Sequence, residues 1–529
     1  MTTRRHALAM AAGGLLCMRQ GWAQTDTALP ESAPAQAPAG ATPSIAAALA
    51  GLDAWLEAQR SAWRVPGLAV ALVKDGQVVY LKGFGFRDAA QTLPVDTDTM
   101  FRGASTTKAV AAATVAMLVD DGKLAWDAPV TTYIPELRFA GGDEYKSVSL
   151  RDMLSHRTGL PRHELLWYHN QTLTPQGLAA RLPFLQVSAP PRARYQYNNL
   201  MYVLAGLAIE RVSGQNWGTF ARARLLAPLG MNRFTLSAPE MALDNNHAVG
   251  HITRTRNLIP IPLRHDPLLG PAGAFNASIG DYAKWVQLQL GMGQHAGRRL
   301  ISTASMAAMW EPLILSSETP AAPDFQRGHY GLGWRIDRYR DTVRVAHGGD
   351  LNGFTPRVVL LPQMNAGLAV LVNHGSHPFA NAVTPDLLDR LLGLPPGDSS
   401  AKAIARRNLA EAAEAAPSRT DRDVELSQPI PGTRPQHPLA TYAGTYRHAG
   451  YGDMQVKHTT DGLTVHYNDM PAALKHRHYD VFEARAARPE HGEFNGTKLV
   501  FQGDEVGKLA GFTAVLDDNV RPVLFSRVA

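Results

Sequence analysis

The sequence predicts a mixed α/β fold in which an antiparallel sheet packs against a helical layer, followed by a small C-terminal antiparallel β-barrel. Strand-like runs stand at both ends of the first part, within residues 68–82 and 357–372, and helical patterns dominate between them. Strands from both ends can share one sheet, which then buries a face against the helices. Residues 439–529 carry short alternating apolar runs between turn signals, as small barrels do.

Local patterns justify each element of the first part. A hairpin is expected at residues 68–73 and 78–82, because the turn signal at 74–77 joins two apolar runs. A second strand pair is expected at 357–361 and 368–372. The main helical patterns lie at residues 105–121, 150–155, 198–212 and 279–290.

Composition shifts divide the chain into five segments. Residues 24–43 are rich in Ala, Pro, Thr and Ser without periodicity, and an Ala-rich helical stretch followed by Pro-rich coil precedes residue 439. We therefore expect a signal peptide at 1–23, a flexible linker at 24–44, the main domain at 45–395, a linker with one helix at 396–438 and the barrel at 439–529.

The N-terminal segment resembles an export signal. Arg4 and Arg5 precede an apolar run at residues 7–18, and small residues flank a cleavage point after Ala23. The run is shorter than the roughly 18–20 residues that span a membrane. We therefore expect an exported protein, periplasmic or secreted, without a membrane span. The only cysteine, Cys17, lies in this segment, so the mature chain would form no disulfide.

Composition excludes some partners. The 529 residues are 45% hydrophobic and 19% charged, with a formal net charge of +6, and loss of Arg4, Arg5 and Arg19 with the signal leaves about +3. No block of Lys and Arg interleaved with aromatic residues occurs, so nucleic acid is not an expected partner. A small-molecule or peptide substrate is expected instead.

The chemistry-bearing pattern is Ser105-Thr106-Thr107-Lys108 at the head of an apolar helical run. Residues three apart share a helix face, so an amine lies beside a hydroxyl, as a serine nucleophile without an Asp–His pair requires. A second copy, from Ser399 to Lys402, follows a Pro-Gly-Asp stretch, and there we expect a helix start only.

Two further motifs supply proton carriers and substrate contacts. Tyr197-Asn198-Asn199 offers a phenol and a carboxamide before a helix, whereas the same spacing from Tyr168 lies in an irregular loop. His347-Gly348-Gly349 follows a strand, where glycines allow a substrate backbone to approach and the Asp350 amide can join that of Ser105 as an oxyanion hole. Gly also lies two residues after His295, His329 and His448, but only His347 combines an incoming strand with a double glycine.

Together, S-x-x-K, Y-x-N and H-x-G in this order resemble the serine β-lactamase-like family of class C β-lactamases, DD-peptidases, D-aminopeptidases and related esterases. Supporting strings lie at residues 101–105, 154–160 and 330–334. The resemblance implies a β-lactamase-like sandwich and an acyl-enzyme formed on amide, peptide or ester bonds without cofactor or metal. It implies catalytic roles for Ser105, Lys108 and Tyr197, and substrate contacts for Asn199, His347, Gly349 and Asp350.

Two departures from the family pattern refine the expected activity. Asn198 replaces the usual Ser between Tyr and Asn, and His347 stands where class C β-lactamases keep a Lys. A His at that place is similar to DD-peptidases and D-aminopeptidases, which we expect this chain to be most like. The alternatives are a β-lactamase or esterase of the same fold, or a penicillin- or peptide-binding protein without turnover.

The C-terminal segment resembles a lipocalin-like module found in some members of this family, through residues 444–448 and 476–480. Such a barrel is expected to fold separately and to cover a cleft or mediate homo-oligomer formation. His476 and His478 would face the same way on a strand, but no companion ligand is placed for a metal.

The two copies of the Ser-Lys motif give a matched test. Ser105→Ala should lower turnover about 10³-fold or more with the fold intact, because a cleft hydroxyl contributes little packing energy. Ser399→Ala should leave turnover unchanged. Steady-state kinetics of both variants check this, and equal activity of the Ser105 variant and wild type would refute the assignment.

Overall fold

The computed structural model describes residues 44–254, 257–317, 325–395, 397–414, 429–486 and 488–528. The expected signal peptide, nearly all of the first linker and part of the second lie outside these residues. Among the helices that are described, none is long and apolar enough to cross a membrane.

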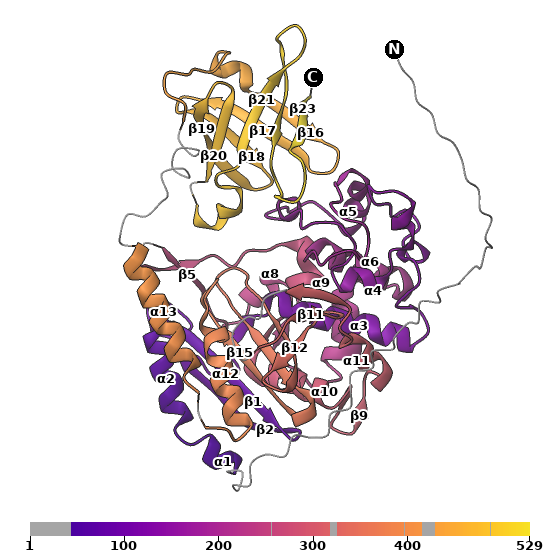
Figure 1. The fold of residues 1–529 in the computed structure, drawn as a ribbon, viewed down its shortest axis with the longest axis vertical. Coiled ribbons are helices and arrows are strands. Elements are labelled where there is room, and N and C mark those ends of the chain that lie inside the picture. The colour runs from indigo at the N-terminus through magenta and orange to yellow at the C-terminus, as the bar shows by residue number, and fades with distance from the viewer. Residues whose placement is uncertain are drawn as a thin grey trace, which may run out of the picture. The chain divides into compact units, whose positions relative to one another are not determined.

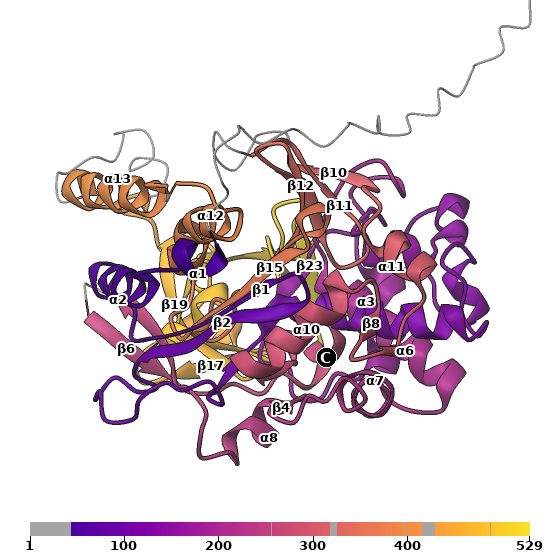
Figure 2. The same cartoon turned by 90° about the horizontal axis from the view of Figure 1, so that it is seen from below.

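The predicted antiparallel sheet is confirmed, and it is central to the main domain (Figures 1 and 2). Both expected strand pairs form, the first with a register shift at Leu72/Val73. In sheet order the described strands are β10 (Ile314–Ser317), β11 (Gly328–Tyr330), β12 (Arg335–Tyr339), β13 (Thr342–Gly348), β14 (Arg357–Leu361), β15 (Ala366–Val372), β1 (Gly67–Lys74) and β2 (Gln77–Gly85).

Helices cover both faces of this sheet, as the view in Figure 2 shows. Alternate residues of β1 enter two separate cores: Leu68, Val70 and Leu72 face one, and Ala69 and Ala71 face the other. The first face is covered by α1 (Ile45–Ala48), α2 (Leu52–Ala62), α12 (Phe379–Leu391) and α13 (Ser399–Glu414). The helical layer that the sequence predicts lies on the second face. The helices on the first face form an additional layer, and they come from the two ends of the domain.

The helical layer on the second face surrounds one helix that is buried on all sides. Residues 107–118 of α3 (Thr107–Asp120) are all buried, which is typical of a helix at the centre of a large core. Its neighbours include α6 (Asn199–Ser213), α7 (Trp217–Ala221), α9 (Gly270–Gly273) and α11 (Thr303–Met309). The short α4 (Leu150–Leu154) packs against α6, and α10 (Ile279–Leu290) lies against β1 and β15.

The second Ser-Lys motif is a helix start, as expected. Ser399 begins α13, and the backbone N–H groups of Ser399 and Ser400 each donate to the Asp386 carboxylate at 3.0 Å. Ser400 also accepts a bond from the Trp63 indole at 3.1 Å. These contacts join α13 to α12 and to the end of α2.

The C-terminal segment forms the expected closed barrel, in which β16 pairs with β23. Its strands are β16 (Gly444–His448), β17 (Gly452–Thr459), β18 (Gly462–Tyr467), β19 (Met470–His478), β20 (Val481–Ala486), β21 (Lys498–Gly503), β22 (Leu509–Ala514) and β23 (Val523–Arg527).

The β18–β19 turn of the barrel holds a loop of the main domain. Asn468, whose φ is +51°, donates from Nδ2 to the carbonyls of Leu165 (3.1 Å) and Tyr168 (2.8 Å). Its Oδ1 accepts from Asn170 Nδ2 at 3.1 Å. A second tie joins His163 Nδ1 and the Tyr451 hydroxyl at 2.7 Å.

Asn468→Gly tests this attachment, because glycine keeps the left-handed backbone conformation but loses the amide bonds. We expect faster amide exchange in residues 161–173 and a loss of about 1–3 kcal/mol in unfolding free energy. The control, Asp461→Ala, changes an exposed turn at the other end of β18. Unchanged exchange in the Asn468 variant would show that the loop holds its conformation without the barrel.

Candidate active site

Ser105 lies in a sharp turn that joins a strand to the central helix. The strand β3 (Met100–Arg102) pairs with β7 (Asn276–Ser278), and a 3₁₀ turn, Ala104–Thr106, leads directly into α3. Ala104 adopts φ +45°, which an L-residue enters at a cost of about 1–2 kcal/mol. The hydroxyl of Thr107 donates to the Ala104 carbonyl at 2.6 Å and helps to hold this turn.

Lys108 places its amine beside the Ser105 hydroxyl, at 3.1 Å. The buried Nζ also contacts Asn199 Oδ1 (2.7 Å) and the Ala272 carbonyl (2.9 Å). Burial lowers the pKa of Lys108 far below its usual value. A neutral amine has two N–H donors and one lone pair, so it can donate to Asn199 and Ala272 and accept from Ser105.

Tyr197 approaches Ser105 from another direction and donates from its hydroxyl to Ser105 Oγ at 2.7 Å. Burial raises the pKa of Tyr197, so the phenol stays protonated. The His156 ring lies against the Tyr197 ring, with centroids 4.3 Å apart, and its Nδ1 accepts from the Asn198 backbone N–H. Asn198 caps α6 by accepting from Met201 N, a task Ser performs equally well.

Asn199 connects the Lys108 amine to a carboxyl group that the motif analysis missed. Its Nδ2 donates to Glu164 Oε1 at 3.0 Å, and Arg162 also contacts this oxygen at 3.1 Å. Burial raises the pKa of Glu164. The loop predicted at Tyr168 as irregular therefore contributes to the site, although its Tyr-x-Asn spacing does not place a phenol on Ser105.

His347 is buried near the end of β13 and lines the same cavity as Ser105. Its Nε2 lies 2.7 Å from the Tyr330 hydroxyl, and its Nδ1 lies 2.6 Å from the Gly348 carbonyl oxygen. Burial lowers the pKa of His347 well below its usual value, so the imidazole is neutral at pH 7. Its contact with a substrate carboxylate or leaving group stays a prediction.

The end of β13 is open on one side, although β13 is an interior strand. Pairing with β12 stops at Ala346, whereas pairing with β14 continues to Gly348. A Cβ on Gly349 would lie 2.6 Å from the Ser105 backbone nitrogen, so only glycine permits this approach. Asp350 accepts a bond from Ser376 N through its carboxylate. The oxyanion-hole role of the Asp350 amide stays a prediction.

Two cavities meet at Ser105 and differ in charge. One, of about 270 Å³, includes the carboxyl groups of Glu164 and of Glu493 from the barrel segment. The other, of about 730 Å³, includes Arg335 and Arg357 together with His347. No group of three or more potential metal ligands occurs in the described part of the chain.

A serine with a buried lysine and a tyrosine on its hydroxyl, in a sandwich of this kind, defines a class of serine hydrolases. The Beta-lactamase family profile matches residues 52–392, and the chain belongs to this family. A second profile, a domain of unknown function (DUF3471), matches residues 428–525.

Curated relatives support the same class. The chain is 30% identical over 409 residues to an unguisins hydrolase of Aspergillus campestris, covering 74% of this chain and 75% of the relative. It is 27% identical over 348 residues to penicillin-binding protein 4 of Amycolatopsis lactamdurans, covering 64% and 87%. The protein is therefore a serine hydrolase.

A solved structure shows the same fold with the C-terminal part included. The octameric penicillin-binding protein homologue from Pyrococcus abyssi matches with a TM-score of 0.59 and 22% identity, covering 90% of this chain and all of that one.

The neutral state of Lys108 can be tested through stability. Because the folded-state pKa lies below the unfolded value near 10.5, the unfolded chain binds more protons between these two values. The unfolding free energy of wild type relative to Lys108→Met should therefore rise with pH there, by up to about 1.4 kcal/mol per pH unit.

Denaturant unfolding at several pH values above 7 measures this slope, with the exposed Lys457→Met as the control for loss of one charge. A difference that does not change with pH would show that Lys108 is charged in the folded protein.

Proposed function

We propose that this chain is an exported serine hydrolase that forms an acyl-enzyme at Ser105 on amide, peptide or ester bonds, most like a DD-peptidase or D-aminopeptidase. One observation carries the proposal: Ser105 Oγ lies 3.1 Å from Lys108 Nζ and 2.7 Å from the Tyr197 hydroxyl. A base and an acid therefore contact the same nucleophile, which both steps of acyl transfer require.

Lys108 is the better base of the two residues. Burial makes its neutral form accessible, whereas burial keeps Tyr197 protonated. As Ser105 Oγ bonds to the substrate carbonyl carbon, its proton passes to Lys108 Nζ. The resulting ammonium keeps two acceptors, Asn199 Oδ1 and the Ala272 carbonyl.

Tyr197 is the better acid for the leaving group. Its hydroxyl already donates to Ser105 Oγ, so it lies within reach of an atom bonded to the attacked carbon. When the C–N or C–O bond breaks, Tyr197 gives its proton to the leaving atom and regains one from Lys108. A water then attacks the ester and gives a proton to Lys108, and Ser105 is released as a hydroxyl.

The choice of substrate class rests on the charge of His347 and on the similarity to one relative. The neutral His347 does not supply the positive charge that a β-lactamase lysine offers to a carboxylate, which favours peptide or ester substrates. The similarity to a penicillin-binding protein supports a β-lactam-reactive serine as the alternative. Export rests on the N-terminal pattern of residues 1–23.

Active-site labelling tests the proposal. A fluorophosphonate or fluorescent penicillin should label wild type at Ser105 and leave Ser105→Ala unlabelled, and the penicillin label should be released with time. Among D-amino-acid amides, short acyl esters and nitrocefin, we expect the highest kcat/KM on amides or esters. A label that is never released, with no turnover of the panel, would indicate a binding protein instead.

A further inference from the structure

A carboxyl group that is not part of the three motifs shares a cavity with the nucleophile. Glu164, Asn199 and Ser105 all line the cavity of about 270 Å³. Glu164 Oε1 accepts from Asn199 Nδ2 at 3.0 Å, and Asn199 Oδ1 lies 2.7 Å from Lys108 Nζ. Lys108 Nζ in turn lies 3.1 Å from Ser105 Oγ. A chain of short contacts therefore connects this carboxyl group with the base and the nucleophile.

Glu164 uses only one of its two carboxyl oxygens in these contacts. Asn199 and Arg162, the latter at 3.1 Å, both contact Oε1. Two donors on one oxygen favour the ionised carboxylate, which has about four acceptor positions. The side chain is 22% exposed and lines the cavity, so Oε2 is available to a molecule that enters there.

The indole of Trp167 lies close to the same carboxyl group. Burial raises the pKa of Glu164, and the Trp167 N–H opposes this rise. Trp167 also lines the cavity and is 3% exposed, yet its Nε1 makes no hydrogen bond to a described residue. A buried donor without an acceptor is costly, and a water between a donor and an acceptor that are too far apart for a direct bond removes this cost.

The cavity has room for such a water beside an acyl group on Ser105. An ordered water needs roughly 10–15 Å³ of cavity volume and about two to four polar partners, and the volume of about 270 Å³ is far larger. Glu164 Oε2 supplies one acceptor and Trp167 Nε1 one donor. A water that uses both keeps one O–H group and one lone pair, and these are the groups that an attacking water needs.

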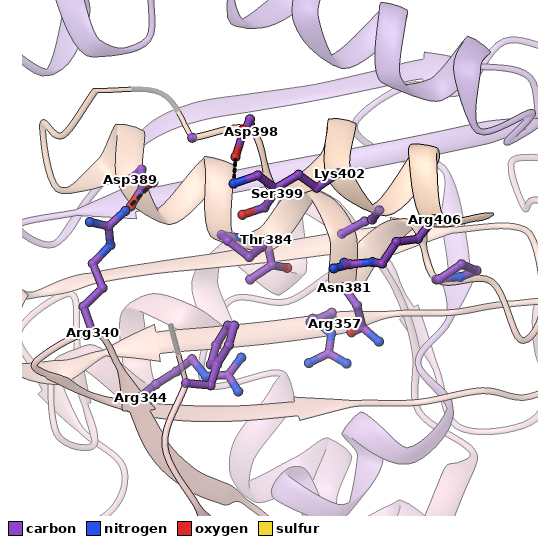
Figure 3. Close-up of a pocket in the computed structure, with 16 residues that line it drawn as sticks. Arg340, Arg344, Arg357, Asn381, Thr384, Asp389, Asp398, Ser399, Lys402 and Arg406 are labelled. Carbon is purple, nitrogen blue, oxygen red and sulfur yellow. Dashed lines mark hydrogen bonds and ion pairs between the residues drawn. The ribbon is translucent and has the colours of Figure 1, made fainter. Parts of the chain in front are cut away.

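The carboxylates of another cavity have different partners. That cavity, of about 650 Å³, lies among residues of β13, β14, α12 and α13, and Ser105 does not line it (Figure 3). Asp389 pairs with Arg340 at 2.9 Å and Asp398 with Lys402 at 2.8 Å, as the dashed lines in Figure 3 show. These carboxylates form ion pairs away from the nucleophile, and the exposed Asp398 therefore gives a control for the loss of one carboxylate.

We propose that Glu164 and Trp167 hold the water that hydrolyses the acyl-enzyme at Ser105. The water donates one O–H to Glu164 Oε2 and accepts from Trp167 Nε1. Its oxygen bonds to the carbonyl carbon of the ester, and its other proton passes to Lys108 Nζ. The C–Oγ bond then breaks, and Lys108 returns the proton to Ser105 Oγ, which leaves a carboxylic acid and the free hydroxyl. This water site rests on the proposed function and adds the residues that act in its second step.

Steady-state and burst kinetics of the full chain with p-nitrophenyl acetate separate the two steps. For this ester kcat/KM reports acylation, whereas kcat also reports release of the acetyl group. Glu164→Gln should lower kcat about 10²-fold, because the attacking water loses its position, with kcat/KM within about threefold of wild type. A burst of about one equivalent of p-nitrophenol per site should precede the slow phase.

Two further variants identify the cause of a slow release. Trp167→Phe keeps a ring but loses the N–H, so kcat should fall about tenfold with kcat/KM retained. Asp398→Asn should keep kcat within about twofold of wild type. Thermal unfolding of each variant measures any loss of stability, and Trp167→Phe decides through the same kinetic split if Glu164→Gln does not fold.

An added amine gives a readout that does not need the water. Glycinamide attacks the acetyl-enzyme from the side that the leaving group vacates and yields N-acetylglycinamide. In Glu164→Gln the ratio of this product to acetate should rise about tenfold or more. An unchanged ratio, or a fall in kcat/KM as large as the fall in kcat, would overturn the water site. If wild type releases no more p-nitrophenol than Ser105→Ala, the proposed function itself fails, and the water site fails with it.

Discussion

The burial of one amine is the constraint on which the rest of the site depends. Lys108 lies in a helix that is apolar on every face, so its Nζ can contact polar atoms only where neighbouring elements bring them. Asn199 arrives from α6 and the Ala272 carbonyl from α9, and Ser105 precedes the helix itself. Each of these elements must pack correctly for the amine to be satisfied, because an unpaired buried polar group costs several kcal/mol. The contacts that satisfy the Lys108 amine therefore depend on the same packing that stabilises the core.

Local periodicity in the sequence predicted those features of the structure that are set by residues close together in the chain. The spacing of Ser105 and Lys108 on one helix face, the two hairpins and the alternation in the barrel all follow from short-range geometry. The meeting of Tyr197 with Ser105 is a tertiary contact across 92 positions, and only the order of three motifs indicated it. The environment of His347 was not predictable, because its burial and its contact with Tyr330 depend on how β11 and β13 lie in the sheet.

Two charged residues escaped motif analysis for the same reason. Glu164 lies in a short irregular segment without periodicity, and its significance comes from Asn199, which is 35 positions away. Arg357 resembles any polar residue at the start of a strand, and only the sheet register places it over Gly348. The result is a cleft in which Glu164 and Glu493 line one cavity at Ser105 and Arg335 and Arg357 line the other, while Arg162 and Asp350 line both. A molecule with separated charges would be oriented by this field before any bond changes.

The barrel contacts the loop beside the site largely through main-chain atoms. Asn468 donates to two backbone carbonyls, which every amino acid carries. These two bonds are therefore indifferent to the loop side chains. Leu165, Leu166 and Trp167 are themselves buried in the core, so the half-buried Tyr168 is the position where a substitution alters the cleft wall without loosening its support. A backbone that is held independently of its side chains is suited to the divergence of substrate preference, and it marks residue 168 as a place where a library of variants would keep the shape of the loop.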